Sequence, residues 1–344
     1  MSEAELREPD QFEGVPLPEW RRAVLGHATA RDGILALLAA NRLPGGILLH
    51  GPRGIGKATL AFDLAREIFA ATGDESPTHV AEQVAAGAYP NLQVLRKAPR
   101  DSGKGFYTEI RVAEVRSAIE RLHHTRGRAG HRVVVIDPID DANTSSANAL
   151  LKILEEPPPE TTFLLISHRP GSLLPTIRSR CHAVALRPIA DALVGDILAQ
   201  THPGEDLAAA ISLAAGRPRR GFEALLVGEG GALSALSGWL ADPARPPAAA
   251  HIALADALVA DKDGAQAQFA RDLIRDWLAA EARAAALAGP NRRRLASASE
   301  LWEKAAEMFA EADAYNLDPR QTLLSIFDAI RKHALQTASP QEPS

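Results

Sequence analysis

A glycine-rich segment near the amino-terminal end contains the residue types that bind phosphate groups. It reads GPRGIGKAT over residues 51–59 and follows a short apolar run, GILLH. In a phosphate-binding loop the glycines, here Gly51, Gly54 and Gly56, let backbone N–H groups turn inward around the phosphates. The lysine that opens the following helix, here Lys57, reaches the β- and γ-phosphates. The segment predicts a nucleotide cradle, and the alternative is a glycine-rich turn without a ligand.

The residue after this lysine departs from the phosphate-binding pattern. The pattern has Ser or Thr there, because the hydroxyl holds Mg²⁺. Ala58 has no oxygen to offer, and Thr59 lies one residue further along the helix, where it points about 100° away. The loop is therefore predicted to cradle a nucleotide without its metal ligand.

A second acidic element lies in the stretch RVVVIDPIDDA. Its apolar run ends at Asp137, which corresponds to the strand-end aspartate that supports Mg²⁺ in phosphoryl-transfer sites. Hydrolysing proteins of this kind place a glutamate next, to activate the attacking water, but here the next residue is Pro138, which cannot act as a base. The alternative is a buried strand that ends in an Asp-Pro turn. The chain thus lacks both the hydroxyl that holds Mg²⁺ and the glutamate that activates water. These two separate losses predict that the chain does not hydrolyse ATP.

The composition limits the classes of protein to consider. The chain has 344 residues, 46% hydrophobic and 24% charged, with a formal net charge of −5. This length suffices for two or three domains, and the charge gives no global attraction for nucleic acid. The one cysteine excludes a disulfide framework. A polar, acidic amino terminus and the lack of apolar runs near about 18 residues predict a soluble cytoplasmic protein without membrane contact.

Short apolar runs alternate with amphipathic helices through the first half of the chain. The runs are continuous rather than alternating, which is typical of strands covered by helices on both faces. This order predicts an α/β fold with a doubly wound, parallel, five-stranded sheet. The five predicted strands are 46–50, 92–95, 133–136, 163–167 and 183–186.

Three domains are expected from changes in composition and hydrophobic patterning along the sequence. Residues 1–187 form the nucleotide-binding-type α/β domain, residues 188–240 a small helical domain, and residues 250–336 an all-helical domain after a linker rich in proline and alanine. In the last domain, Asp318 is a candidate helix N-cap, followed by Pro319 at the first helical position.

Three stretches resemble a known family. They read LPGGILLHGPRGIGKATLA, VVVIDPIDDANTSSANALLKILEEPPPETTFLLIS and LLPTIRSRC. Together they resemble the clamp-loader branch of the AAA+ proteins, and within it the delta-prime-type subunits of bacterial DNA polymerase III. The motifs cover roughly residues 20–225, and the carboxy-terminal NLDPRQTLL resembles the collar domain of the family more weakly.

The resemblance implies both an architecture and a function. It implies an AAA+-type sheet domain, a small helical lid and a helical collar that mediates oligomerisation. It also implies a non-hydrolysing subunit of the DNA polymerase III holoenzyme that helps to load the sliding clamp onto primed DNA during replication. The implied partners are motor subunits of the gamma/tau type, a clamp-opening subunit of the delta type, and, through the complex, the clamp and DNA.

The resemblance also assigns roles to single residues. In the family, the arginine of the Ser-Arg-Cys motif, here Arg180, projects towards ATP bound by a neighbouring motor subunit; the alternative is a surface arginine. Ser167 corresponds to a polar sensor of the γ-phosphate, with His168 as the less suitable neighbour. Arg220 aligns with the arginine of the second sensor, and the alternative is a basic turn exposed to water.

Two further predictions concern metal and DNA. Relatives carry four zinc-binding cysteines between the helix after the loop and the second strand; this interval has none here, and His79 alone cannot hold zinc. We therefore expect no zinc, and local packing must stabilise residues 71–92. Asn148 and Lys152 lie one turn apart on a polar helix face and are candidates to face DNA; the alternative is a solvated face.

The sequence leaves open whether the predicted phosphate-binding loop is occupied by a nucleotide. The only cofactor expected is ATP or ADP, held weakly by Lys57 and the glycines, and the sequence does not decide whether nucleotide binds at all. Two other functions stay open: an autonomous P-loop ATPase such as a clamp-loader motor subunit, and a nucleotide-binding scaffold unconnected with replication.

Overall fold

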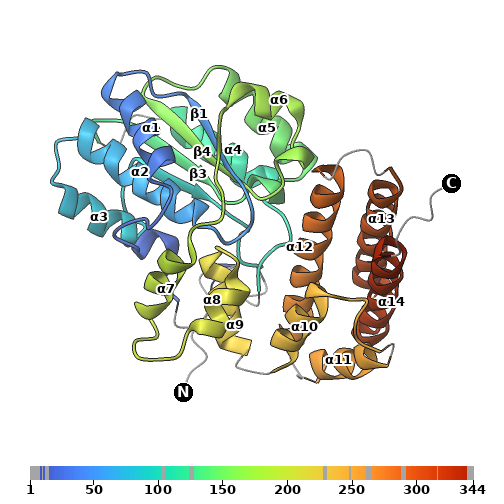
Figure 1. The fold of residues 1–344 in the computed structure, drawn as a ribbon. Coiled ribbons are helices and arrows are strands. Elements are labelled where there is room, and N and C mark those ends of the chain that lie inside the picture. Colours follow the sequence, from blue (N-terminus) through green and yellow to red (C-terminus); the bar gives the residue numbers. More distant parts are fainter. Residues whose placement is uncertain are drawn as a thin grey trace. The chain divides into compact units, whose positions relative to one another are not determined.

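The chain forms two compact units, Met1–Phe222 and Glu223–Ser344. The first is α/β and the second is helical in this computed structural model (Figure 1). The predicted boundary near residue 188 falls inside the first unit. The structure describes residues 8–9, 11, 15–101, 105–123, 128–227, 231–247, 249–260, 265–287, 292–315 and 317–338.

Five parallel strands build the sheet of the first unit. They follow the spatial order β2-β3-β4-β1-β5, and every neighbouring pair is parallel. The predicted strands are confirmed, with ends that shift by at most two residues. The strands are β1 (Gly46–His50), β2 (Leu92–Leu95), β3 (Arg132–Ile136), β4 (Thr161–Ser167) and β5 (His182–Ala185).

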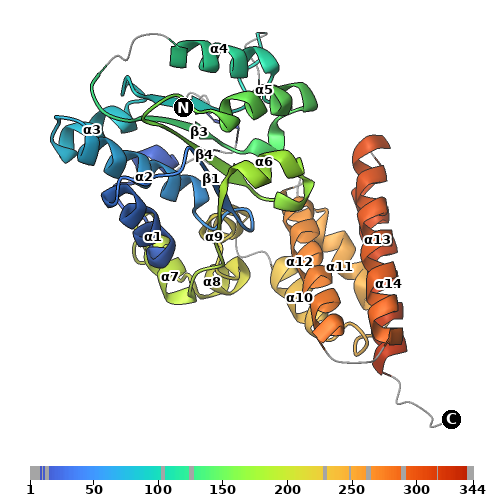
Figure 2. The ribbon, with the colours of Figure 1, turned by 90° about the horizontal axis from the view of Figure 1, so that it is seen from above.

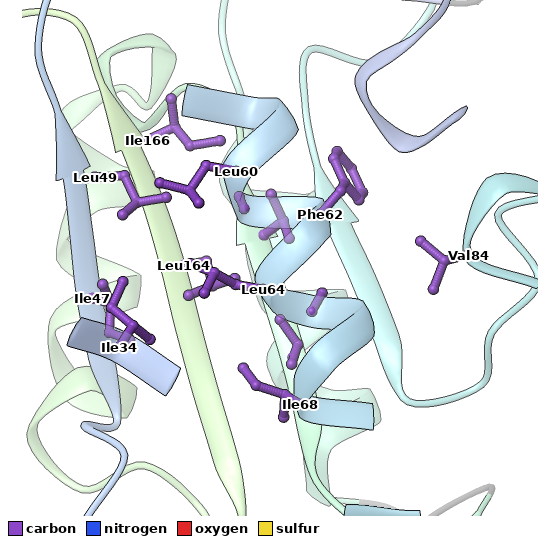
Figure 3. Close-up of a cluster of buried hydrophobic side chains, with 14 of the residues drawn as sticks. Ile34, Ile47, Leu49, Leu60, Phe62, Leu64, Ile68, Val84, Leu164 and Ile166 are labelled. Carbon is purple, nitrogen blue, oxygen red and sulfur yellow. The ribbon is translucent and has the colours of Figure 1, made fainter. Parts of the chain in front are cut away.

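Helices cover both faces of this sheet, which explains the continuous apolar runs. One face packs Leu49 of β1 and Leu164 of β4 against α2, whose Leu60 and Leu64 point towards the strands (Figure 3). The opposite face buries residues of the alternate register, such as Leu165, against α4 and α5. The helices on the first face are α1 (Ala28–Ala39), α2 (Lys57–Thr72) and α3 (Pro77–Ala85); those on the second are α4 (Val112–His123), α5 (Thr144–Glu155) and α6 (Pro175–Arg180).

Three helices follow the sheet: α7 (Asp191–Ala199), α8 (Ala208–Ala214) and α9 (Pro218–Val227). Helices α7 and α9 approach closely at Gly221, where an added Cβ would lie 2.9 Å from a methyl carbon of Leu198. The first turn of α9 belongs to the first unit, since the boundary between the units follows Phe222.

The interval that carries cysteines in relatives contains α3 instead. Val80 and Val84 are fully buried against α2, and the Tyr89 ring stacks on Phe69 with centroids 4.2 Å apart. His79 is exposed on this helix. Among the described residues no group of three or more His, Cys, Asp or Glu side chains could hold a metal ion. Apolar packing stabilises this segment.

After the end of α9, the described part of the second unit contains five helices (Figure 2): α10 (Gly231–Ala241), α11 (Ala250–Leu258), α12 (Ala265–Leu287), α13 (Arg292–Tyr315) and α14 (Pro319–Ala338). The predicted cap at the start of α14 is confirmed, because Asp318 Oδ1 accepts a hydrogen bond of 2.9 Å from the Arg320 backbone N–H. Phe327 of α14 is fully buried and packs its ring against Trp239 of α10, with centroids 4.9 Å apart. No described helix in either unit combines the length and apolarity needed to span a membrane.

Candidate nucleotide-binding site and arginine rim

The glycine loop runs from the end of β1 to the start of α2, and its glycines are required by its conformation. Gly51, Gly54 and Gly56 have φ values of 150°, 82° and 99°, which side-chain-bearing residues rarely adopt. An added Cβ would lie 2.3 Å from the Leu186 carbonyl oxygen at Gly51, and 2.7 Å from Arg219 Cβ at Gly54. The loop therefore has the tight backbone of a phosphate cradle.

The amine of Lys57 is buried within this loop. Its Nζ donates hydrogen bonds of 2.7 Å to the carbonyl oxygens of both Gly51 and Pro52, and the residue is 3% exposed. Burial lowers the pKa of Lys57 to about 8, although Asp137 and Asp140 act in the opposite direction. A phosphate that enters the cradle would share the three N–H donors of this amine with the two carbonyls or replace them as its partners.

The residues that should hold Mg²⁺ do not fit a metal ion. Ala58 offers no oxygen and packs at the edge of the hydrophobic core. Asp137 follows β3, as predicted, but its Oδ2 lies 3.2 Å from both Nε and Nη2 of Arg96. Thr59 lines the cavity next to the loop. The carboxylate that supports the metal in active relatives is thus paired with an internal guanidinium.

Arg96 is the centre of a half-buried charge cluster that the sequence interpretation missed. Its Nη1 lies 2.8 Å from a carboxylate oxygen of Glu8, and its Nη1 and Nη2 donate to the two oxygens of Glu19 at 3.2 and 3.3 Å. Burial opposes its charge, but Asp137, Glu19 and Glu8 outweigh burial and raise the pKa of Arg96. Its guanidinium carbon also lies 5.3 Å from the centre of the Phe62 ring. The available signal was its position directly after β2, beside the strand that carries Asp137.

A cavity of about 230 Å³ opens between the loop, the amino-terminal segment and helices α7 and α9 of the first unit. Its apolar lining includes Val24, Leu25, Ile197 and Phe222. The described residues that line it also include six cationic side chains: Arg21, Arg53, Lys57, Arg96, Lys97 and Arg219. Three lining carboxylates are Glu8, Asp137 and Asp141.

The predicted sensor residues occupy neighbouring but different environments. Ser167 is fully buried at the end of β4, and its hydroxyl donates to Asp140 Oδ1 at 3.1 Å. His168 lines the cavity, and its backbone N–H donates to Asp140 Oδ2 at 2.7 Å. Asp140 thus fixes the end of β4, and among the described residues His168 rather than Ser167 reaches the cavity wall.

At the second sensor, too, the neighbour of the predicted residue lines the cavity. Arg220 is 4% exposed and is absent from the described cavity lining. Arg219 lines the cavity instead, and its backbone N–H donates to the Gly54 carbonyl at 3.2 Å. The start of α9 therefore contacts the glycine loop through Arg219.

Arg180 lies outside the described lining of this cavity, at the carboxyl end of α6. Its Nη1 donates to the Thr176 carbonyl at 2.9 Å, and its Nη2 forms an ion pair with Glu155 at the end of α5. The arginine side chain is 30% exposed. Cys181 follows, and burial raises the pKa of its thiol to about 11. We call Arg180 and Glu155 the arginine rim.

The candidates for DNA contact lie on the same helix as Glu155. Asn148 and Lys152 are exposed on α5, on the face opposite the buried Leu150 and Ile153. The polar face is therefore solvated in this chain, and contact with DNA stays a prediction.

The fold and the site together define a class of protein. The domain is of the AAA+ α/β type: it has a parallel sheet of this strand order, a glycine loop after β1, an acidic residue after β3 and helices beside the cavity. Residues 27–190 match the family model described as DNA polymerase III, delta subunit.

Individual proteins are similar to this chain over part or most of its length. The DNA polymerase III subunit delta′ of Pseudomonas aeruginosa is 42% identical over 138 residues, which cover 39% of this chain and 40% of that protein. The gamma/tau subunit from Mycobacterium bovis is 32% identical over 168 residues, which cover 48% of this chain and 28% of that protein. A solved structure of a gamma subunit-related protein from Thermotoga maritima matches over 88% of this chain and 99% of its own, with 15% identity and a TM-score of 0.41. The resemblance to delta-prime-type subunits is confirmed, over less than half the length of the delta′ relative.

Proposed function

We propose that this chain is a delta-prime-type subunit of a DNA polymerase III clamp loader and works in the cytoplasm. It assembles with gamma/tau-type motor subunits and a delta-type clamp-opening subunit, and the complex loads the sliding clamp onto primed DNA. The family match over residues 27–190 supports this assignment. One structural observation carries it: Asp137, at the position of the metal-supporting aspartate, is paired with Arg96, whereas Arg180 lies outside the described lining of the chain's own cavity.

In this proposal the chain does not hydrolyse ATP. Ala58 supplies no hydroxyl for Mg²⁺, and Pro138 has no carboxylate to activate water. The pairing of Asp137 with Arg96 adds a third obstacle, because two guanidinium nitrogens already engage Oδ2 of the carboxylate. ATP or ADP in the cradle would act as a structural ligand and not as a substrate.

The contribution to catalysis is made in trans by Arg180. A guanidinium next to the γ-phosphate of a neighbouring subunit neutralises the charge that develops in the transition state. Such a residue is worth about 10³-fold or more in kcat in well-studied systems. The γ-phosphate would replace the Glu155 carboxylate as the partner of Arg180, exchanging one anion for another.

Assembly tests the proposal directly. The purified chain is mixed with gamma/tau-type and delta-type subunits, and the mixture is separated by size-exclusion chromatography. We expect one complex that contains all three and that loads a clamp onto primed DNA only when this chain is present. Separate elution at micromolar concentration would contradict the assignment and favour a scaffold unconnected with replication.

An autonomous P-loop ATPase is the second candidate, because the loop backbone and Lys57 retain a phosphate-binding arrangement. Turnover by the isolated chain separates the two functions. Mg²⁺-dependent phosphate release that is abolished in Lys57→Ala would favour the ATPase. We expect no release above the background of that variant.

A further inference from the structure

The strongest disagreement between this chain and a metal-dependent nucleotide site lies at Asp137. A carboxylate that supports Mg²⁺ must offer its negative charge to the cation. Here Oδ2 of Asp137 receives two guanidinium nitrogens of Arg96, each at 3.2 Å. The internal cation already occupies the carboxylate that a metal would use.

This cation is fixed in place. The side chains of Arg96 and Asp137 are only 10% and 16% exposed, and Glu19 and Glu8 hold the remaining guanidinium nitrogens. Moving Arg96 aside for a metal would leave three carboxylates without their shared partner. Breaking a buried ion pair by removal of one member is strongly unfavourable. A divalent cation at Asp137 therefore meets a carboxylate oxygen that two guanidinium nitrogens already occupy. It also meets a described cavity lining in which six cationic side chains outnumber three carboxylates.

The glycine loop that lines the same cavity has the features of an anion site. Gly54 and Gly56 hold the loop backbone in the left-handed region, which turns backbone N–H groups inward. Lys57 directs its amine at two carbonyls of the same loop, from which a phosphate oxygen can displace it. Arg53 belongs to this loop, Arg219 contacts it, and both line the cavity.

The remaining wall suits an aromatic ring. Val24 and Leu25 precede α1, whereas Ile197 and Phe222 come from α7 and α9. An apolar wall next to a phosphate cradle is the arrangement that accepts a nucleoside polyphosphate rather than inorganic phosphate alone.

From this arrangement we infer that the cavity binds a nucleoside di- or triphosphate as the metal-free anion, and that Mg²⁺ weakens this binding. Arg96 takes over the neutralising role at Asp137, and Lys57 with the loop N–H groups holds the phosphates. In a metal-dependent site Mg²⁺ is part of the bound complex, whereas here its positive charge opposes binding.

Calorimetry with ATP tests the inference on the full chain. ATP is titrated once in EDTA and once in excess Mg²⁺, with sodium chloride added to equalise ionic strength. We expect binding in EDTA and affinity weaker by about tenfold or more in Mg²⁺. Affinity that is unchanged or stronger in Mg²⁺ would overturn the inference, as would a failure to bind ATP in either buffer.

Three variants localise the effect, each checked by circular dichroism. Lys57→Ala should lose ATP binding in EDTA. Arg178→Ala is the control, because Arg178 is exposed on α6 outside the described cavity lining, and this variant should keep both binding in EDTA and the preference for metal-free ATP. Ala58→Ser restores the missing hydroxyl, and we expect the same preference because Arg96 still holds Asp137. If Ala58→Ser made binding depend on Mg²⁺, the role assigned to Arg96 would be wrong.

This inference rests on the cavity and not on the proposed function. A chain that binds no ATP could still enter a clamp-loader complex, and a chain that enters no complex could still bind ATP. The result of the calorimetry therefore does not determine the result of the co-elution experiment, and each tests its own proposal.

Discussion

Two ion pairs of the α/β unit show how differently this chain treats its two functional regions. At the cavity, Arg96 and Asp137 are 10% and 16% exposed and share a cluster with Glu19 and Glu8. At the arginine rim, Arg180 and Glu155 are 30% and 50% exposed and form a simple pair. The first pair is embedded and the second is accessible to another molecule.

The difference has a physical consequence. An exposed ion pair contributes about 0–1 kcal/mol, so a competing anion can replace its carboxylate with little loss. A buried pair resists exchange, because separating it leaves uncompensated charge in a poorly solvated place. In our proposal this difference keeps metal out of the cavity, whereas Arg180 can exchange Glu155 for a phosphate on a neighbouring subunit.

The largest expected effect is on folding stability. Arg96→Leu removes the common partner of three carboxylates and should lower the free energy of unfolding by about 3–5 kcal/mol. Arg180→Leu is the matched control at the exposed pair and should cost less than about 1 kcal/mol. Urea denaturation of both variants measures the difference. Equal losses would show that the two pairs do not differ as proposed.

The next effect concerns the pH dependence of ATP binding in EDTA. Because the pKa of Lys57 is lowered to about 8, its amine loses its charge above that pH. Phosphate favours the charged amine, so affinity should fall by about tenfold per pH unit above pH 8, until the pKa in the complex is reached. Calorimetry between pH 7.5 and about 9.5 checks this. A flat profile would mean that Lys57 does not hold the phosphate.

The lowered pKa of Lys57 also makes the folding stability depend on pH. Between pH 8 and the ordinary lysine value of 10.5, the unfolded chain binds more protons at this lysine than the folded chain does. The contribution of Lys57 to stability therefore rises with pH across that window. Lys57→Ala should remove this component of the pH profile.

The smallest expected effect is at the rim. Glu155→Gln removes the negative charge that pairs with Arg180 but keeps the shape of the side chain. We expect a stability change below about 1 kcal/mol, since the pair is exposed. In a reconstituted clamp loader, ATP turnover should be maintained or rise slightly, because Arg180 no longer has to leave a carboxylate. A large loss of turnover would show that Glu155 has a catalytic part of its own.

Much of this arrangement could be predicted from the sequence, because each element has a strong local signal. Continuous apolar runs predicted the five strands, and the pair Asp318-Pro319 predicted the start of α14. Val80 and Val84 have the i, i+4 spacing that could have predicted α3 in the cysteine-free interval. The glycines of the loop predicted its backbone conformation.

The side chains that reach the cavity were harder to predict. A buried strand shows no polar alternation, so its sequence does not tell whether Ser167 or His168 faces the cleft. One residue along a helix changes the direction by about 100°, which separates Arg219 from Arg220. The contact of Arg96 with Asp137 and Glu19 joins segments distant in sequence. Such pairings depend on tertiary packing and have no local signature.

The central claim is that this chain acts on the ATP site of a neighbour through Arg180. The most direct test is the rate of ATP hydrolysis and clamp loading by complexes reconstituted with wild-type chain, Arg180→Ala or Arg178→Ala. The last is a matched control, since Arg178 is exposed on the same short helix. We predict that all three chains assemble, that Arg180→Ala lowers turnover at the adjacent site by about 10³-fold, and that Arg178→Ala retains it. Wild-type rates with Arg180→Ala in an intact complex would contradict the account.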